Sequence, residues 1–577
     1  MHKCLNVSEI LHNICTKVRR LGELELDEAT HEQLFEARRT LFRLALTCRA
    51  LKDTALDVLW GDLDSLYPLL CSLPNLQTMS GDYIEIGRAL RASDLEIFQK
   101  YAKRVRRLGC GQEALNMADV LRVLCSFPAP NGSLLPNLRL LSWDCDDSDT
   151  FPFIRYFLHP SLISLRLLGK LWRPPKASFM TFLPVHCPHL HSLSCASLNR
   201  SATKPISDYI CQSHELHHVD CGLPNEAAVK HLMKLPSLKG FTITLTEEDG
   251  PYDGYKGEFC PQLATFSIIA GSLNQARMFF RNLQLSPTHL HFKTSTMTKC
   301  EDIRRIFKQL PDHFSPAKLE SLQLTVEIIR RNLDTTDTEC DLDIHALKEL
   351  FKFRNLVDVR LEDSCMLGLN DNDMSDFVSS WPNIEVLKLG TGFEWSVPDD
   401  DEIATSGITL KGLNTLVSGC RKLRVLGLVF DACITNEDDR AIRFHTKHQI
   451  NENVEEFDVG GSIINDAVAV AVFISSLMPK LRALKFVTVY YEGGKLRQVS
   501  DSRPTLWTQV NMMLEFANIR EQRRREGQAG WADSGDEEGS LIKPEFSVFG
   551  QSSLSRVEDP SKVPTTPSTL RSSMLKT

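Results

Sequence analysis

A six-residue phrase, apolar at its first, fourth and sixth positions, recurs thirteen times between Leu138 and Phe486. Clean copies read Leu162/Leu165/Leu167 and Leu423/Leu426/Leu428, and successive copies start 22 to 39 residues apart. One such unit cannot bury its apolar face alone, so the units must stack on one another. The phrase therefore predicts a solenoid, in which each unit contacts only its neighbours. Val105/Leu108/Cys110 forms a candidate fourteenth copy that starts the array earlier.

Helical patterns fill the spaces between the phrases, for example at residues 225–234, 412–419 and 466–477. Proline often stands just before a phrase, where it ends the preceding helix because it disfavours helical geometry in the residue before it. Each unit is therefore expected to be a helix, a turn and a short strand. This pattern resembles leucine-rich repeats. We expect an α/β fold, with a curved parallel sheet backed by helices on its convex side.

Composition favours a folded soluble protein. Of the 577 residues, 42% are hydrophobic and 24% are charged, and the net charge of −8 gives no support to a general nucleic-acid role. The longest apolar run, 467–478, is far shorter than the roughly 20 residues that span a bilayer. The 17 cysteines are scattered, several at buried repeat positions, which is typical of a reducing compartment. The polar amino terminus lacks the apolar core of a signal peptide. We expect a cytoplasmic or nuclear location and no membrane partner.

Residues 1–67 lack the phrase and read as a few short helices with more apolar surface than so small a segment can bury. Three segments of this region, residues 5–11, 44–51 and 55–60, resemble an F-box, in the form common in mushroom-forming fungi. The resemblance implies a small all-α module that binds a Skp-type adaptor and, through it, a cullin complex. The residues expected to meet the adaptor or the core of the module are Leu5, Ile10, Leu11, Ile14, Leu44 and Cys48. A second interpretation is that these helices only cap the first repeat.

The rest of the chain divides by composition. We expect repeats over 68–495, a helical cap over 496–527 and a disordered tail over 528–577, because the tail has no apolar periodicity. Near its start the tail carries the acidic string 533–538. Ser534 and Ser540 there resemble the phosphorylation sites of a degron, although acidic tails often contain such strings.

The variable residues of each phrase should point out of the stack, in two columns on the concave face. The middle of these columns is small and rich in hydroxyl groups, and the last third carries charges of both signs. Small solvated residues are one interpretation of the columns. The other is a binding strip for a protein substrate, formed by Arg360, Lys388, Glu456, Asp458 and Lys485.

The string His214-Glu215-Leu216-His217-His218 matches a zinc-protease motif, which requires a helix to bring both histidines to one metal. Here the string overlaps a predicted strand, where residues four apart lie roughly 13 Å apart. His191 and His217 occupy equivalent repeat positions, so a metal site at their approach is the alternative to ordinary surface histidines. We expect no catalytic residues, no metal and no cofactor.

The sequence thus favours a non-enzymatic substrate receptor of a cullin-based ubiquitin ligase, which the F-box resemblance implies. One alternative is a leucine-rich-repeat scaffold without a link to ubiquitin. Another is an activator of a GTPase that presents Arg166 or Arg360 to the nucleotide phosphate.

Overall fold

The structure is a computed structural model that describes residues 8–21, 31–74, 76–79, 83–111, 117–128, 132–145, 147–167, 172, 174–195, 200–250, 252–295, 300–326, 341–361, 366–392, 407–434, 450–487, 489–492, 495–498 and 503–532. The chain forms two units, Met1–Ile519 and Arg520–Thr577. The sheet and its helices lie in the first unit.

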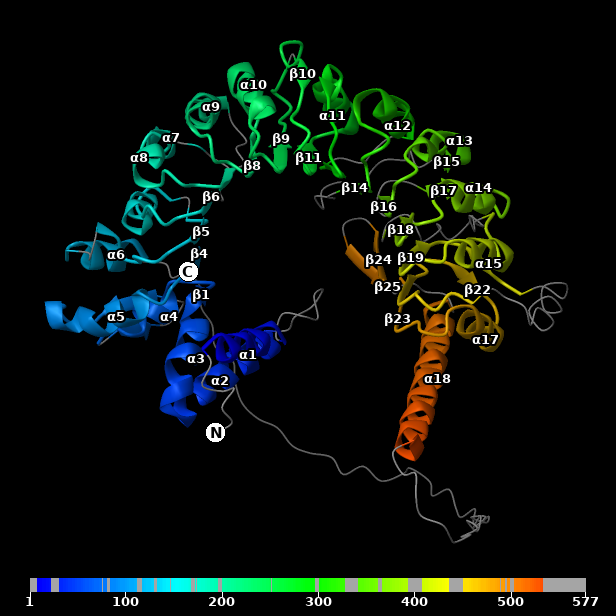
Figure 1. Cartoon of the computed structure of the whole chain (residues 1–577), viewed down its shortest axis with the longest axis horizontal. Coiled ribbons are helices and arrows are strands. Elements are labelled where there is room, and N and C mark those ends of the chain that lie inside the picture. The colour runs from blue at the N-terminus through cyan, green and yellow to red at the C-terminus, as the bar shows by residue number, and fades with distance from the viewer. Residues whose placement is uncertain are drawn as a thin grey trace, which may run out of the picture. The chain divides into compact units, whose positions relative to one another are not determined.

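A single parallel sheet of fifteen strands organises this unit, and its strands follow one another in chain order (Figure 1). All thirteen phrases form strands, and the candidate fourteenth does so as well, as Arg107–Cys110. A fifteenth strand, Asp62–Leu63, was not predicted, and it starts the sheet inside the segment assigned to the helical module. The strands are β1 (Asp62–Leu63), β4 (Arg107–Cys110), β5 (Leu140–Trp143), β6 (Ser164–Leu167), β7 (Ser192–Cys195), β8 (His218–Gly222), β9 (Gly240–Thr244), β11 (Thr265–Ala270), β13 (His289–Thr294), β14 (Ser321–Val326), β16 (Asp358–Leu361), β18 (Val386–Leu389), β19 (Val425–Leu428), β21 (Glu456–Asp458) and β23 (Ala483–Lys485).

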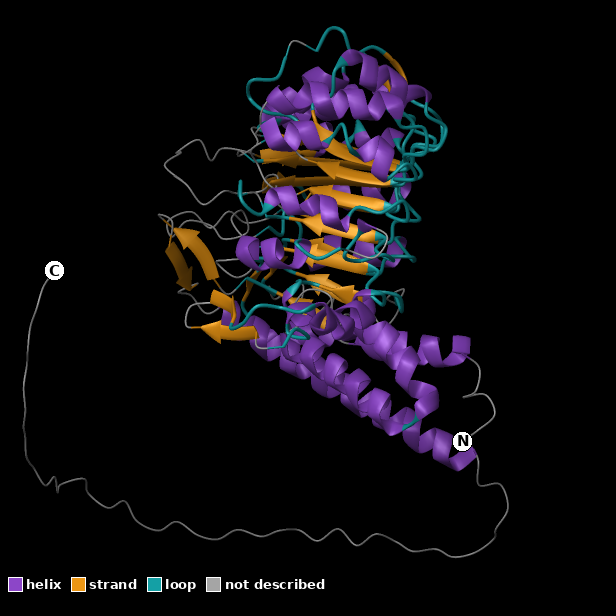
Figure 2. Cartoon of the chain, turned by 90° about the vertical axis from the view of Figure 1, so that its left-hand side faces the viewer, coloured by secondary structure: helices purple, strands orange, loops and turns teal. Residues whose placement is uncertain are grey.

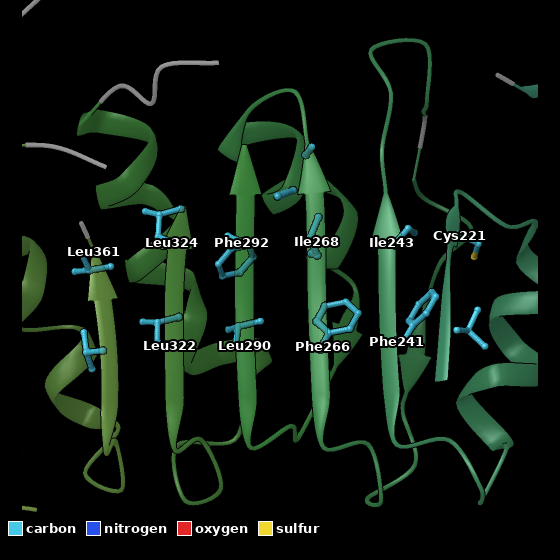
Figure 3. Packing of buried hydrophobic residues seen from close by; sticks show 14 of the residues in the cluster. Cys221, Phe241, Ile243, Phe266, Ile268, Leu290, Phe292, Leu322, Leu324 and Leu361 are labelled. Carbon is cyan, nitrogen blue, oxygen red and sulfur yellow. The ribbon is translucent and has the colours of Figure 1, made fainter. Parts of the chain in front are cut away.

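The apolar positions of the phrase form ladders across the sheet. Phe241, Phe266 and Leu290 are register partners on neighbouring strands, and their side chains are buried side by side (Figure 3). The rings of Phe241 and Phe266 lie 5.9 Å apart. Because the strands pair in the same register, each strand buries its apolar residues against those of the next strand. This burial removes apolar surface from water and stabilises the stack.

Helices cover the outer side of the curved sheet, as predicted (Figure 1). Several begin at side-chain caps: the Asn225 carboxamide oxygen accepts from the Ala228 amide at 2.9 Å. The helices of this layer are α4 (Tyr67–Leu70), α5 (Leu95–Ala102), α6 (Met117–Cys125), η4 (Phe151–Phe157), α7 (Pro174–Phe179), α8 (Leu183–His186), α9 (Thr203–Gln212), α10 (Glu226–Lys234), α11 (Leu273–Phe280), α12 (Cys300–His313), α13 (Ile344–Leu347), α14 (Asp373–Ser380), α15 (Leu410–Gly419) and α17 (Ala467–Leu477).

Shorter helices and strands occur between the main elements of the repeats. Turns of 3-10 helix occur at η2 (Ala92–Asp94), η5 (Arg200–Ala202) and η6 (Leu350–Lys352). Five small two-stranded sheets pair β2 (Leu76–Met79) with β3 (Tyr83–Ile86), β10 (Gly257–Glu258) with β12 (Leu283–Gln284), β15 (Asp341–Asp343) with β17 (Met366–Gly368), β20 (Asp431–Ala432) with β22 (Ile463–Ile464), and β24 (Val489–Glu492) with β25 (Lys495–Gln498).

Three helices precede the sheet: α1 (Ser8–Leu21), α2 (His31–Thr47) and α3 (Arg49–Gly61), and we call residues 8–61 the N-terminal module (Figure 2). The module has a small apolar core of its own, formed by Cys15, Leu41, Ala45, Ala55 and Val58.

At the other end, α18 (Arg503–Ala532) packs its first turns on the last repeats, with Trp507, Val510 and Leu514 buried in the main core. This helix covers most of the predicted cap. The tail beyond residue 532 lies outside the described residues.

The described part of the chain contains no helix with the length and apolar character of a membrane span. Its cysteines are free thiols except Cys300, which is disulfide-bonded, a bond that the sequence interpretation did not include.

Gly109 on β4 allows a close backbone approach. A Cβ atom there would lie 2.9 Å from the carbonyl oxygen of Asp64, whereas a Cβ at Gly111, two residues on, would meet nothing within 4 Å. We therefore expect Gly109→Ala to lower the free energy of unfolding by about 1–3 kcal/mol, because backbone must shift to relieve the contact. Gly111→Ala is the control and should change it little. Urea denaturation measures both, and equal stabilities of the two variants would contradict the contact.

Candidate functional site

Two surfaces are candidates for binding, and the first is the N-terminal module. Among the residues whose side chains the structure describes, its helices leave five large apolar side chains exposed to solvent: Ile10, Ile14, Phe35, Phe42 and Leu46. The two isoleucines lie one turn apart on α1, and the other three share a helical spacing on α2. Apolar groups gathered in this way on a small module are typical of a protein-binding surface.

The structure divides the residues that the F-box resemblance assigned to the adaptor or the core. Ile10 and Ile14 are 38% and 41% exposed, whereas Leu11 is only 3% exposed and so belongs inside the module. Leu44 and Cys48 are half-buried, and Leu44 packs against the module core. Leu5 lies outside the described residues.

Sequence reasoning missed the exposed positions on α2. Phe35, Phe42 and Leu46 follow one another at intervals of seven and four residues, a helical repeat that the sequence displays. The buried Leu41 and Ala45 lie between them, so the apolar positions of α2 form two stripes. The stripe of Phe35, Phe42 and Leu46 was the sequence signal that α2 has an exposed apolar surface in addition to its buried one.

Polar contacts fix the module to the first repeats. The Arg104 guanidinium, 16% exposed and just before β4, pairs with Asp53 at 2.7 Å and also with Asp57, both on α3. Trp60 stacks on Tyr101 of α5 with ring centroids 4.4 Å apart. The module is therefore held against the first repeats and does not hang on a linker.

The second surface is the exposed face of the sheet, opposite the buried ladders. Neighbouring strands bring Arg166, Ser194 and Asp220 into register, as the column pattern predicted. The Ser194 hydroxyl donates to the Asp220 carboxylate at 2.7 Å, and burial raises the pKa of Asp220 while Ser194 and Arg166 oppose that rise. This part of the face is hydroxyl-rich, with Arg166 exposed beside it.

The predicted substrate strip lies on β16, β18, β21 and β23. Arg360 and Lys388 are register partners, as are Asp458 and Lys485, and Gly427 stands between the two pairs. The first pair carries like charges and the second carries opposite charges.

Arg360 donates to Asp358 at 2.9 Å, and Lys485 lies 3.7 Å from Glu456. The strip is therefore a network of paired charges. A partner that binds these side chains must first break the ion pairs between them. Sequence alone did not reveal these pairings.

A further row of side chains was not anticipated. The residue before each strand donates its amide to the carbonyl oxygen of the equivalent residue in the preceding repeat, at 2.7–2.9 Å throughout. This entry row consists of Arg106, Arg139, Ile163, His191, His217, Lys239, Ala264, Thr288, Glu320, Val357, Glu385, Arg424, Glu455 and Arg482. Its members therefore lie side by side along the edge where the strands begin, about 4.8 Å apart.

The histidines of this row approach each other as predicted, with the rings of His191 and His217 4.6 Å apart. Glu215 accepts from His189 at 3.2 Å and lies 3.7 Å from the His191 ring nitrogen. Partial burial, followed by the neighbours His191, Lys239 and His218, lowers the pKa of His217.

The zinc-protease motif does not stand on a helix. Its last residue, His218, opens strand β8. Among the described residues, no group of three or more histidine, cysteine or acidic side chains is placed to hold a metal ion.

Comparison with known proteins finds no matching family and no matching curated protein. Solved structures with some likeness include an internalin of Listeria monocytogenes, at 12% identity and a TM-score of 0.32, covering 73% of this chain and 97% of that one. The yeast Rad7 and Elc1 complex scores 0.31 at 12% identity, covering 82% and 92%. The Drosophila Toll–Spatzle complex scores 0.27 at 12% identity, covering 71% and 62%.

These TM-scores are too low to assign the fold, so the assignment depends on the sheet itself. Fifteen parallel strands follow one another in chain order, and fourteen of them carry the apolar phrase. With the helices behind them, they define a leucine-rich-repeat solenoid. The chain is a leucine-rich-repeat protein with a helical module before its first full repeat.

Proposed function

We propose that this chain is the substrate-recognition subunit of a cullin-RING ubiquitin ligase of the SCF type, acting in the cytoplasm or nucleus. Its N-terminal module would bind a Skp-type adaptor, and its repeats would bind a protein substrate. The observation that carries the proposal is the exposed apolar surface of the module, with Ile10 and Ile14 on α1 and Phe42 and Leu46 on α2. Such a surface needs a partner, and the F-box resemblance of the same helices names its class.

The proposed role requires no catalytic group in this chain. A receptor accelerates ubiquitin transfer by holding the substrate near the conjugating enzyme, which raises the effective concentration of its lysines. The contacts of Arg104 with α3 and of Trp60 with Tyr101 support this role, because a firmly seated module restricts where a bound substrate lies.

Co-purification with a Skp-type adaptor tests the proposal. We expect the wild-type chain to retain the adaptor and Ile10→Asp/Ile14→Asp to lose it at least about tenfold, because charged groups replace apolar ones that the adaptor would bury. Both side chains are exposed, so the fold should survive the change. The matched control is Val468→Asp/Val472→Asp, a pair with the same spacing on α17, 58% and 59% exposed, which should keep the adaptor.

A wild-type chain that ignores the adaptor refutes the proposal and favours the alternative, a repeat scaffold unrelated to ubiquitin. Equal losses in the two double variants would also count against it, since they would show a general effect of surface charge.

A further inference from the structure

The entry row is segregated by charge. Five of its first six members are basic residue types: Arg106, Arg139, His191, His217 and Lys239. The last six members are instead Glu320, Val357, Glu385, Arg424, Glu455 and Arg482, and Arg424 pairs there with Glu455 at 3.5 Å. One half of the edge is thus basic, while the other half is mixed and partly self-compensated.

The arginines and the lysine of the basic half are accessible. Arg106, Arg139 and Lys239 are exposed, and among the described residues no carboxylate pairs with any of them. The Arg106 guanidinium donates to the Asn137 carbonyl oxygen at 3.3 Å. Glu215 contacts His189 and His191, and Asp220 accepts from Ser194.

Arg106 and Arg139 are neighbours on the backbone ladder, and Lys239 lies four strands further on. The like charges of the neighbouring pair repel each other, and an anionic partner relieves that repulsion. Six neighbouring strands span roughly 24 Å at about 4.8 Å per step, the length of about seven residues of extended peptide. Arg166 lies exposed on β6, between its register partners Ser142 on β5 and Ser194 on β7. These side chains add hydrogen-bond donors beside the row.

We propose that the starting edge of strands β4 to β9 binds an acidic, extended peptide segment of a partner protein, with Arg106, Arg139 and Lys239 as its principal contacts. This inference depends on the proposed function insofar as the partner is the ligase substrate. A short acidic segment fits better than a nucleic acid, because a long uniform polyanion running along the row would meet Glu320, Glu385 and Glu455.

The test is fluorescence anisotropy with the purified full chain and a labelled peptide of eight glutamates, at low and at physiological salt. We expect wild-type binding that weakens with salt, and at least a tenfold loss in Arg139→Glu/Lys239→Glu. The matched control is Arg424→Glu/Arg482→Glu, which makes the same change of charge at equivalent positions in the other half of the row. Its affinity should stay within about twofold of wild type.

Equal losses in the two variants, or a wild-type chain that does not bind the peptide, would overturn the inference. So would a single-stranded RNA of equal charge that binds more tightly than the peptide. The assay needs no adaptor, which separates the two proposals: Ile10→Asp/Ile14→Asp should bind the peptide normally, and Arg139→Glu/Lys239→Glu should still retain the adaptor.

Discussion

Replacing Trp507 with alanine is expected to lower the free energy of unfolding of the last repeats by about 3–5 kcal/mol, the usual cost of removing a large buried aromatic side chain. Trp507 is 1% exposed, and its indole nitrogen donates to the Ser462 carbonyl oxygen at 2.8 Å. Its ring meets Phe430 edge-on, with centroids 6.1 Å apart. The change therefore removes packing, an aromatic contact and a buried hydrogen bond together.

The effect should be local, because a repeat array is stabilised mainly between neighbours. Hydrogen exchange should accelerate in β19, β21 and β23 and remain slow in β6 and β7. Met512→Ala, on an exposed side of the same helix, is the control and should leave exchange unchanged. Slow exchange of the last repeats in the Trp507 variant would mean that α18 is dispensable as a cap.

The regular part of the fold was predictable because it repeats. Each phrase places apolar residues at the same three positions, so a single rule identifies thirteen strands, and the candidate at Val105 is confirmed as a fourteenth. β1 escaped prediction because Asp62–Leu63 is too short to carry the phrase. It forms a strand because β4 beside it offers partners, with Asp62 opposite Arg107 and Leu63 opposite Leu108.

The surfaces were less predictable, since their properties depend on which side chains pair. The sequence places Arg360 and Lys485 on the exposed face correctly, but their ion pairs with Asp358 and Glu456 appear only when the strands are built. The entry row was overlooked for a related reason. Its position within the phrase is variable in every copy, so no consensus marks it, and only the backbone ladder brings its members together.

The N-terminal module shows the same limit at Leu11. Residues 10, 11 and 14 are all apolar, and a helical pattern alone does not say which of them faces the core when a second apolar surface is present. The structure resolves this ambiguity, since Leu11 is buried while its neighbours Ile10 and Ile14 are exposed. Substitutions at these positions should therefore have different effects, although they lie within one helical turn.

Leu11→Asp is expected to unfold the module, at a cost of at least about 3 kcal/mol, because it removes an apolar side chain that is only 3% exposed and puts a carboxylate in its place. Hydrogen exchange should become fast throughout α2 and α3, while the repeats from β5 onward stay protected by their own ladders. Ile14→Asp, on the exposed side of the same helix, should keep slow exchange and yet weaken adaptor binding. If Leu11→Asp left α2 and α3 protected, the side chain would lie on the surface and not in the core. If it also released the repeats, the module would be a cap that the solenoid requires, and the cap would then become the stronger explanation of these helices.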